Sequence, residues 1–255
     1  MPDSRRLLIL GGTGEARQLA DTLATRRPGL SVITSLAGRT VEPRRPAGEL
    51  RIGGFGGAAG LADYLRRTQV DLVIDATHPY AAAISRHAVE ACRSAARPLL
   101  RLERGPWRAE TGDRWAEVDS LTAAARAAPS LGRRAFLTIG VKELSAFAGI
   151  PDLWFLVRLV EMPAEPLPLL DHEILLGRGP FAAGAERDLL RGRGIEFVIA
   201  KNSGGVATYG KIAAARELGL SVILLRRPEL PQAETVESVE AATAWVAARL
   251  GPSGS

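Results

Sequence analysis

A glycine-rich turn at Gly11 to Ala16 follows the first apolar segment of the chain and precedes an amphipathic one. In dinucleotide-binding folds such a turn lets the backbone approach a pyrophosphate, whose charge meets the free N–H groups and positive end of the next helix. Arg17 replaces the last glycine of the usual fingerprint, and a simple tight connection can have the same composition. We expect a dinucleotide here. Its predicted contacts are Gly12, Thr13, Gly14, Glu15 and Ala16.

The second apolar segment ends in Ser-Leu-Ala-Gly-Arg at residues 35–39. An NAD site normally places Asp or Glu about 20 residues beyond the glycine turn, to bind the ribose 2′-hydroxyl. No acid stands here, whereas a hydroxyl and a guanidinium suit a 2′-phosphate that an acid would repel. The segment therefore favours NADPH over NADH, and a solvated loop charge is the alternative for Arg39. The predicted contacts are Ser35, Ala37, Gly38 and Arg39.

Two further loops follow apolar segments. Gly-Gly-Phe-Gly-Gly at residues 53–57 permits a close backbone approach to a ligand, and a merely flexible loop is the alternative. Thr-His-Pro-Tyr at residues 77–80 stands at the expected carboxyl end of a parallel strand, where open α/β sheets place ligands. A lone histidine also fits a structural role. From these loops we expect cofactor contacts by Gly54, Phe55, Gly56, Thr77, His78 and Pro79.

Lysine is rare in this chain, and its positions are informative. Of the 33 basic residues only Lys142, Lys201 and Lys211 are lysines. Lys201 opens the loop Lys-Asn-Ser-Gly-Gly after an apolar segment, and Lys211 follows closely, so two of the three lysines flank one loop. A compact ammonium at a strand end suits anion binding or proton transfer, and surface solvation is the alternative.

Alternating apolar and amphipathic segments predict the elements that position these loops. Nearly continuous apolar strands separated by helices are typical of a doubly wound parallel sheet covered on both faces. Strands are expected at 6–10, 30–34, 49–52, 70–76, 98–102, 134–138, 153–160, 196–200 and 221–225, and helices at 15–25, 59–68, 81–95, 121–128, from 142, 182–191, 212–218 and 236–249. The pattern weakens near residue 107, so we predict one α/β domain at 1–106 and a second at 107–255.

Composition excludes several classes of protein. The net charge of +5 comes from arginines spread along the chain, which fits a small polyanionic ligand better than nucleic acid. One cysteine and three histidines show no metal-ligand spacing, so no metal is expected. No apolar run is long enough to cross a membrane, and we predict a cytoplasmic protein. The Tyr-x-x-x-Lys pair of short-chain dehydrogenases is also absent.

Seven motifs in order, GGTGEA, SLAGR, GGFGG, DATHPYA, GRGPF, KNSGG and YGKIAAARELGLSVILLRRP, resemble the precorrin-6A reductase family of cobalamin biosynthesis. The resemblance covers nearly the whole chain. It implies two Rossmann-like domains with the active site in the cleft between them, the first binding NADPH and the second the substrate. It also implies that one double bond of the precorrin-6A macrocycle is reduced to give precorrin-6B, which other pathway enzymes then take over. The macrocycle's carboxylates suit an arginine-rich chain.

Under this resemblance the candidate proton donors are Lys201, Tyr80 and His78, with solvent as a further source. The expected substrate-binding residues are Tyr80, Thr138, Gly140, Gly179, Pro180, Phe181, Lys201, Ser203, Gly204, Gly205 and Lys211. Three alternatives remain open: an NADH-dependent cobalt-precorrin-6A reductase, a non-catalytic NADP-sensing protein, and a nucleotide-sugar reductase or epimerase.

Overall fold

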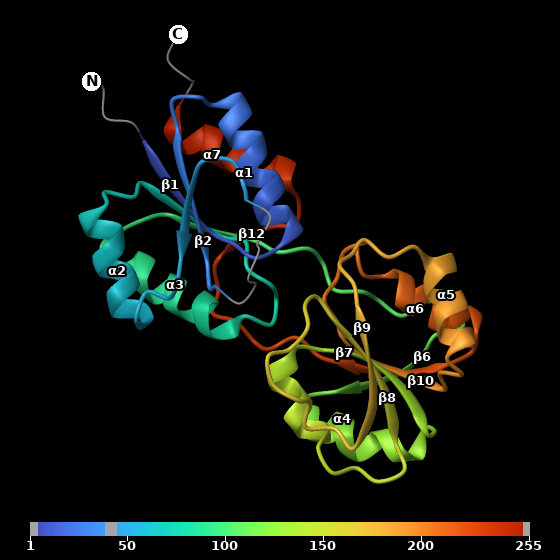
Figure 1. The fold of residues 1–255 in the computed structure, drawn as a ribbon. Helices are drawn as coiled ribbons and strands as arrows, with labels where there is room; N and C mark the ends of the chain where they lie inside the picture. The colour runs from blue at the N-terminus through green and yellow to red at the C-terminus, as the bar shows by residue number, and fades with distance from the viewer. Residues whose placement is uncertain (1–4, 39–44, 252–255) are drawn as a thin grey trace. The chain divides into compact units, whose positions relative to one another are not determined.

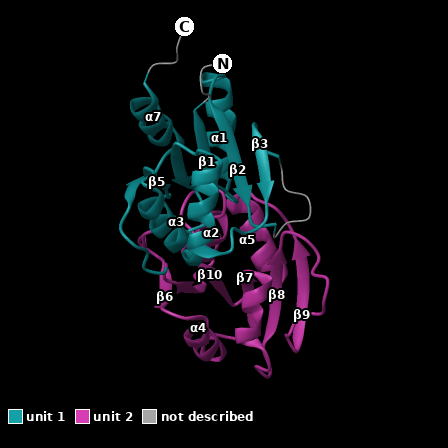
Figure 2. Ribbon diagram, turned by 90° about the vertical axis from the view of Figure 1, so that its left-hand side faces the viewer, with its two compact units in different colours: residues 1–104, 228–255 teal, residues 105–227 magenta. Residues whose placement is uncertain are grey.

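The computed structural model describes residues 5–38 and 45–251, which form two compact α/β units (Figure 1). Unit 1 runs to Arg104 and resumes at Pro228, and unit 2 is Gly105–Arg227 (Figure 2). The chain therefore passes between the units twice. None of the described helices is both long and apolar enough to cross a membrane.

Unit 1 contains one fully parallel sheet of six strands. The strands are β1 (Arg6–Leu10), β2 (Ser31–Leu36), β3 (Glu49–Ile52), β4 (Leu72–Asp75), β5 (Leu99–Leu102) and β12 (Glu234–Val236). Their order is β12-β5-β4-β1-β2-β3. This is the 3-2-1-4-5-6 order of dinucleotide-binding folds, with β12 as the sixth strand. The order reverses between β1 and β4, which is where such sheets place their ligand.

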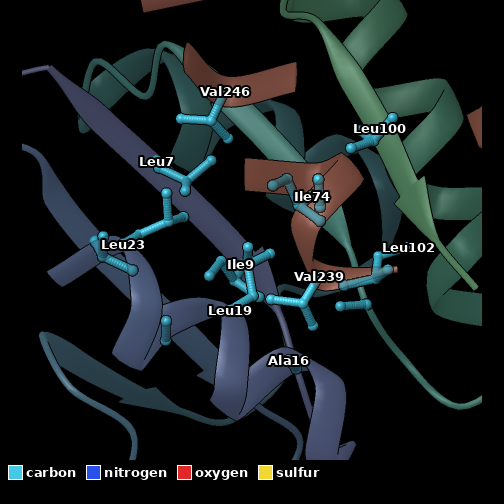
Figure 3. Packing of buried hydrophobic residues seen from close by; sticks show 14 of the residues in the cluster. Leu7, Ile9, Ala16, Leu19, Leu23, Ile74, Leu100, Leu102, Val239 and Val246 are labelled. Carbon is cyan, nitrogen blue, oxygen red and sulfur yellow. The ribbon is translucent and has the colours of Figure 1, made fainter. Parts of the chain in front are cut away.

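Helices cover both faces of this sheet because its four central strands are apolar on both sides. Helices α1 (Gly14–Arg26) and α7 (Val239–Leu250) cover one face, and their core includes Leu7, Leu23 and Val246 (Figure 3). Helices α2 (Gly57–Arg67) and α3 (Ala82–Ala95) cover the other. The two cores hold the strand ends rigidly, so the loops that follow the strands have fixed starting points.

Unit 2 repeats the same design. Its strands are β6 (Arg114–Val118), β7 (Arg134–Thr138), β8 (Trp154–Leu159), β9 (Asp171–Leu176), β10 (Phe197–Lys201) and β11 (Ser221–Leu225), all parallel, in the order β6-β11-β10-β7-β8-β9. Helix α4 (Leu121–Ala127) and the 3₁₀ segments Ala128–Ser130 and Val141–Phe147 cover one face. Helices α5 (Ala183–Gly192) and α6 (Gly210–Glu217) cover the other.

The predicted fold class of two doubly wound parallel-sheet units is confirmed, and the domain boundary differs in one respect. The first passage between the units falls at Arg104, close to the predicted boundary at residue 106. Residues 228–251, however, belong to unit 1 and not to the predicted second domain. The reason is that β12 pairs with β5 and Trp245 of α7 is buried in the unit 1 core.

The sequence pattern missed β6, β9 and β12 and predicted a regular helix where Val141–Phe147 is 3₁₀. Each missed strand lies at the outer edge of a sheet and is largely exposed or only partly buried. Edge strands lack the continuous apolar run that marks a central parallel strand. Residue Val236, predicted to begin a helix, is the last residue of β12.

Candidate functional site

The glycine turn in unit 1 connects β1 to α1 at the switch point of the sheet. Gly12 has φ +119°, a backbone angle that residues other than glycine rarely adopt. Thr13 caps the helix: its Oγ1 accepts a hydrogen bond from the Ala16 amide at 3.1 Å and donates one to the Ala76 carbonyl at 2.8 Å. The cap therefore fixes the turn to the loop after β4.

This turn fits the pyrophosphate of a dinucleotide. A Cβ built on Gly14 would meet no atom within 4 Å, so the space beside it is open. Among the described residues, none accepts a hydrogen bond from the amides of Gly14 and Glu15. Free N–H groups at a helix start attract an anion. The Glu15 carboxylate, which would repel that anion, is paired with Arg104 at 2.8 Å.

Ser35, one residue before the end of β2, lies beside an arginine that sequence reasoning did not single out. Ser35 on β2 is paired in register with Arg51 on β3, and Arg51 Nη1 donates to Ser35 Oγ at 3.3 Å. Arg51 also donates to the carbonyls of Gly53 and Gly54, and its guanidinium lies 3.8 Å from the Phe55 ring centroid. Ala37 and Gly38 follow β2 directly. Arg39 lies outside the described residues.

The predicted Gly-Gly-Phe-Gly-Gly loop is ordered around Phe55. The Phe55 ring packs edge-on against Tyr64 and face-on against Arg51. Gly56 has φ +78° and precedes α2, and a Cβ on Gly60 would overlap the Phe55 carbonyl. Phe55 therefore anchors the loop, and Arg51 links it to the end of β2.

A buried carboxylate at the end of β4 holds the Thr-His-Pro-Tyr loop in place. Asp75, at the end of β4, accepts hydrogen bonds from the backbone amide and hydroxyl of Thr77 at 3.2 and 2.7 Å. Its other oxygen lies 3.7 Å from Arg101, which is buried too and donates to the Pro231 carbonyl at 3.1 Å. In the same loop, the ring centroids of His78 and Tyr80 are 5.7 Å apart. Sequence reasoning missed Asp75 as the residue that positions this loop.

Lys201 in unit 2 is held in an ion pair. It is the last residue of β10, and its Nζ lies 2.6 Å from Oε1 of Glu143, which follows β7. Glu143 also accepts the backbone N–H of Gly140 at 2.9 Å. The side chain of Lys201 is mostly covered, with 14% exposed. Glu143 is thus a counter-ion that the sequence pattern gave no means of finding, because 58 positions separate the two residues.

The loop after Lys201 is fastened to the two segments by which the chain enters and leaves unit 2. The Asn202 side chain accepts from the amide of Trp107 at 2.7 Å and donates to its carbonyl at 3.0 Å. Arg227 donates to the carbonyls of Asn202 and Ser203 at 2.9 and 3.1 Å. Gly204, at φ +69°, packs so closely that a Cβ would overlap the Gly105 carbonyl.

The remaining predicted residues of unit 2 fall into two groups. The first group lies at the carboxyl ends of two strands: Thr138 ends β7 and Gly140 follows it, and Gly179, Pro180 and Phe181 follow β9. Lys211 is different, because its side chain is buried under Trp107, with Nζ donating to the Thr208 carbonyl at 2.7 Å. Burial lowers the pKa of Lys211 to about 7. The substrate contact by Lys211 stays a prediction, and the structure places this side chain inside unit 2.

Each unit therefore gathers its predicted loops at the carboxyl edge of its own sheet. In unit 1 these are the loops after β1, β2, β3 and β4, and in unit 2 those after β7, β9 and β10. A family model described as "Precorrin-6x reductase CbiJ/CobK" matches residues 6–247. The chain belongs to this family. It is an oxidoreductase of cobalamin biosynthesis, as the motif resemblance predicted.

Named relatives agree with this assignment. The chain is 49% identical to a precorrin-6A reductase of Rhodococcus erythropolis over 94% of this chain and 97% of the relative. It is 28% identical to a cobalt-precorrin-6A reductase of Priestia megaterium over 88% and 91%. A solved structure named "CobK precorrin-6A reductase" superposes with a TM-score of 0.92 at 45% identity, covering 98% of both chains. These matches support precorrin-6A reductase function.

The close packing of Gly204 gives a testable prediction. Gly149 shares its backbone conformation, with φ +70° against +69°, but has open space around its Cα. Gly149→Ala should cost about 1–2 kcal/mol of unfolding free energy through backbone strain alone. Gly204→Ala should cost about 1–3 kcal/mol more, because the methyl group overpacks against Gly105, and should also lower turnover. Urea unfolding and steady-state kinetics of both variants measure this; equal stability losses would contradict the packing role.

Proposed function

We propose that this protein reduces one double bond of precorrin-6A with NADPH to give precorrin-6B. Family membership supports the macrocycle as substrate, and the carboxyl edge of unit 1 supports the cofactor. The observation that carries the cofactor assignment is the turn at Gly12 to Glu15, with free amides and open space beside Gly14. The bound nicotinamide would supply a hydride, and the protein would position both reactants and provide a proton path.

Unit 1 offers a separate residue set for each part of NADPH. The amides of Gly14 and Glu15 would hold the pyrophosphate. Ser35 and Arg51 would bind the 2′-phosphate, because they place a hydroxyl and a guanidinium at the end of β2. Within the described part of the chain, Arg51 contacts only neutral oxygens and rings. A phosphate would provide the counter-charge that it lacks there.

Protonation has several candidate donors. His78 and Tyr80 follow the strand next to the glycine turn, so in the proposal they lie near the cofactor. Lys201 is held by Glu143, and a substrate carboxylate could replace that partner without leaving the ammonium unpaired. We assign Lys201 to substrate binding, with proton transfer as its second role.

Sequence identity to the named relatives and the residues at the end of β2 indicate which macrocycle and which nicotinamide cofactor we propose. The relatives that act on the metal-free macrocycle, by their names, are closer in sequence than the cobalt-precorrin-6A reductase. Ser35 and Arg51 favour NADPH over NADH. We therefore place the chain with the metal-free, NADPH-dependent branch of the family.

Anaerobic turnover tests the proposed function directly. We expect NADPH absorbance to fall when purified protein is mixed with precorrin-6A, and the product to gain two mass units for the added hydrogens. The same assay with NADH and with cobalt-precorrin-6A should be slower. NADPH binding without turnover would support the NADP-sensing alternative, and faster turnover of the cobalt macrocycle with NADH would support the other branch.

Cofactor preference should depend on Arg51. Arg51→Ala should weaken NADPH by about 10- to 150-fold, since a hydrogen bond to a charged group contributes about 1.5–3 kcal/mol, whereas NADH should change little. Arg66→Ala removes the same charge from an exposed position of unit 1 and serves as the control. Fluorescence titration with both cofactors measures the dissociation constants. Equal losses for NADPH and NADH would mean that Arg51 only shapes the Phe55 loop.

Lys201 should matter for the macrocycle and not for the cofactor. Lys201→Ala should leave the NADPH dissociation constant unchanged and lower kcat/KM for precorrin-6A by about 100-fold, the scale of a lost positioned proton donor or charged contact. Lys201→Arg should restore much of the activity if the role is binding. Arg191→Ala, on the exposed side of α5, is the control for lost charge. Normal kinetics of Lys201→Ala would reject the assignment.

A further inference from the structure

Several exposed apolar side chains lie at or just beyond the carboxyl ends of neighbouring strands in unit 2. Val141 follows β7, Val160 follows β8, Leu176 ends β9 and Val206 lies in the loop after β10. These strands are adjacent in the order β10-β7-β8-β9. Exposed apolar side chains are unremarkable when scattered, but a group of them at one edge of a sheet indicates a binding surface.

Side-chain and backbone contacts join these loops into one surface. Lys201 after β10 is paired with Glu143 after β7. Arg178 after β9 lies 3.4 Å from Glu161 after β8. The Phe181 amide donates to the Ala207 carbonyl at 3.0 Å, which fastens the loop after β9 to the loop containing Val206. The apolar side chains therefore belong to a single tied set of loops.

Cations stand beside the apolar side chains on the same loops. Lys142 adjoins Val141 and is exposed, and within the described residues it has no ion-pair partner. Arg178 is two positions from Leu176 and is also exposed. A surface of apolar contacts bordered by cations is complementary to a flat apolar ring that carries carboxylates at its periphery.

We propose that Val141, Val160, Leu176 and Val206 form an apolar platform for the face of the tetrapyrrole macrocycle, with Lys142 and Arg178 pairing with its carboxylates. This inference rests on the proposed function and names its binding surface. The charged loop residues alone would hold only the periphery of the ring. The platform gives its apolar face a partner that removes it from water.

Val206 is the residue that tests the platform most cleanly. It is 91% exposed, so a polar replacement has no core to disturb. Leu170 is 70% exposed and immediately precedes β9, at the opposite edge of the same sheet, and provides the matched control. Val206→Asp should raise the dissociation constant for precorrin-6A about tenfold, because it loses apolar contact and faces the ring carboxylates. Val206→Leu should bind the macrocycle at least as tightly as the wild type.

The experiment measures anaerobic binding of precorrin-6A by fluorescence quenching and NADPH affinity in parallel. Weaker macrocycle binding by Val206→Asp, with normal binding by Leu170→Asp and unchanged NADPH affinity in both, supports the platform. Equal behaviour of the two Asp variants overturns it, whether both bind normally or both bind weakly. If the wild type reduces precorrin-6A and Val206→Asp is equally active, the platform is refuted but the proposed function stands. A wild type that neither binds nor reduces precorrin-6A refutes the proposed function as well.

Discussion

The completion of the unit 1 sheet by a strand from the end of the chain is the constraint on which the rest of the structure depends. In unit 1 the strand after β5 in the sheet is β12, which comes from the end of the chain, and in unit 2 the strand after β11 is β6, which precedes β7. The sheet of unit 1 therefore needs two separate pieces of sequence, whereas the sheet of unit 2 lies wholly within residues 105–227. The chain must therefore pass between the units twice, and residues next to both passages are hydrogen-bonded to the loop after Lys201. Asn202 holds one of them at Trp107, and Arg227 belongs to the other.

Fully parallel pairing explains why the candidate residues gather as they do. Every strand in a parallel sheet ends at the same edge, so the loops that follow the strands are brought together whatever their distance in sequence. Helices on both faces leave that edge as the place where glycine turns, free amides and side chains meet a ligand. In unit 1 the edge offers amides and a guanidinium, and in unit 2 an ammonium and exposed valines.

Central strands were predictable from the sequence because burial on both faces leaves a continuous apolar run. Strands at Arg6–Leu10, Arg134–Thr138 and Ser221–Leu225 have the predicted bounds. The edge strand Glu234–Val236 was missed, since three partly exposed residues carry no such run. Site partners distant in sequence, such as Glu143 for Lys201, were unpredictable because only the folded chain brings them together. The burial of Lys211 on α6 was unpredictable for the same reason, because it depends on packing against Trp107.

The return of the chain to unit 1 also has a consequence for biosynthesis. Ribosomes deliver domains in order, and a domain normally folds once its own residues have emerged. Here the core of unit 1 includes Val239, Trp245 and Val246, which are translated near the end. Residues 105–227 can complete their own sheet first. Until α7 is synthesised, Leu100 and Leu102 of unit 1 stay uncovered on one face of its sheet. Unit 1 is thus synthesised mostly first but completed last, and a chain truncated before the final helix cannot close the core of unit 1.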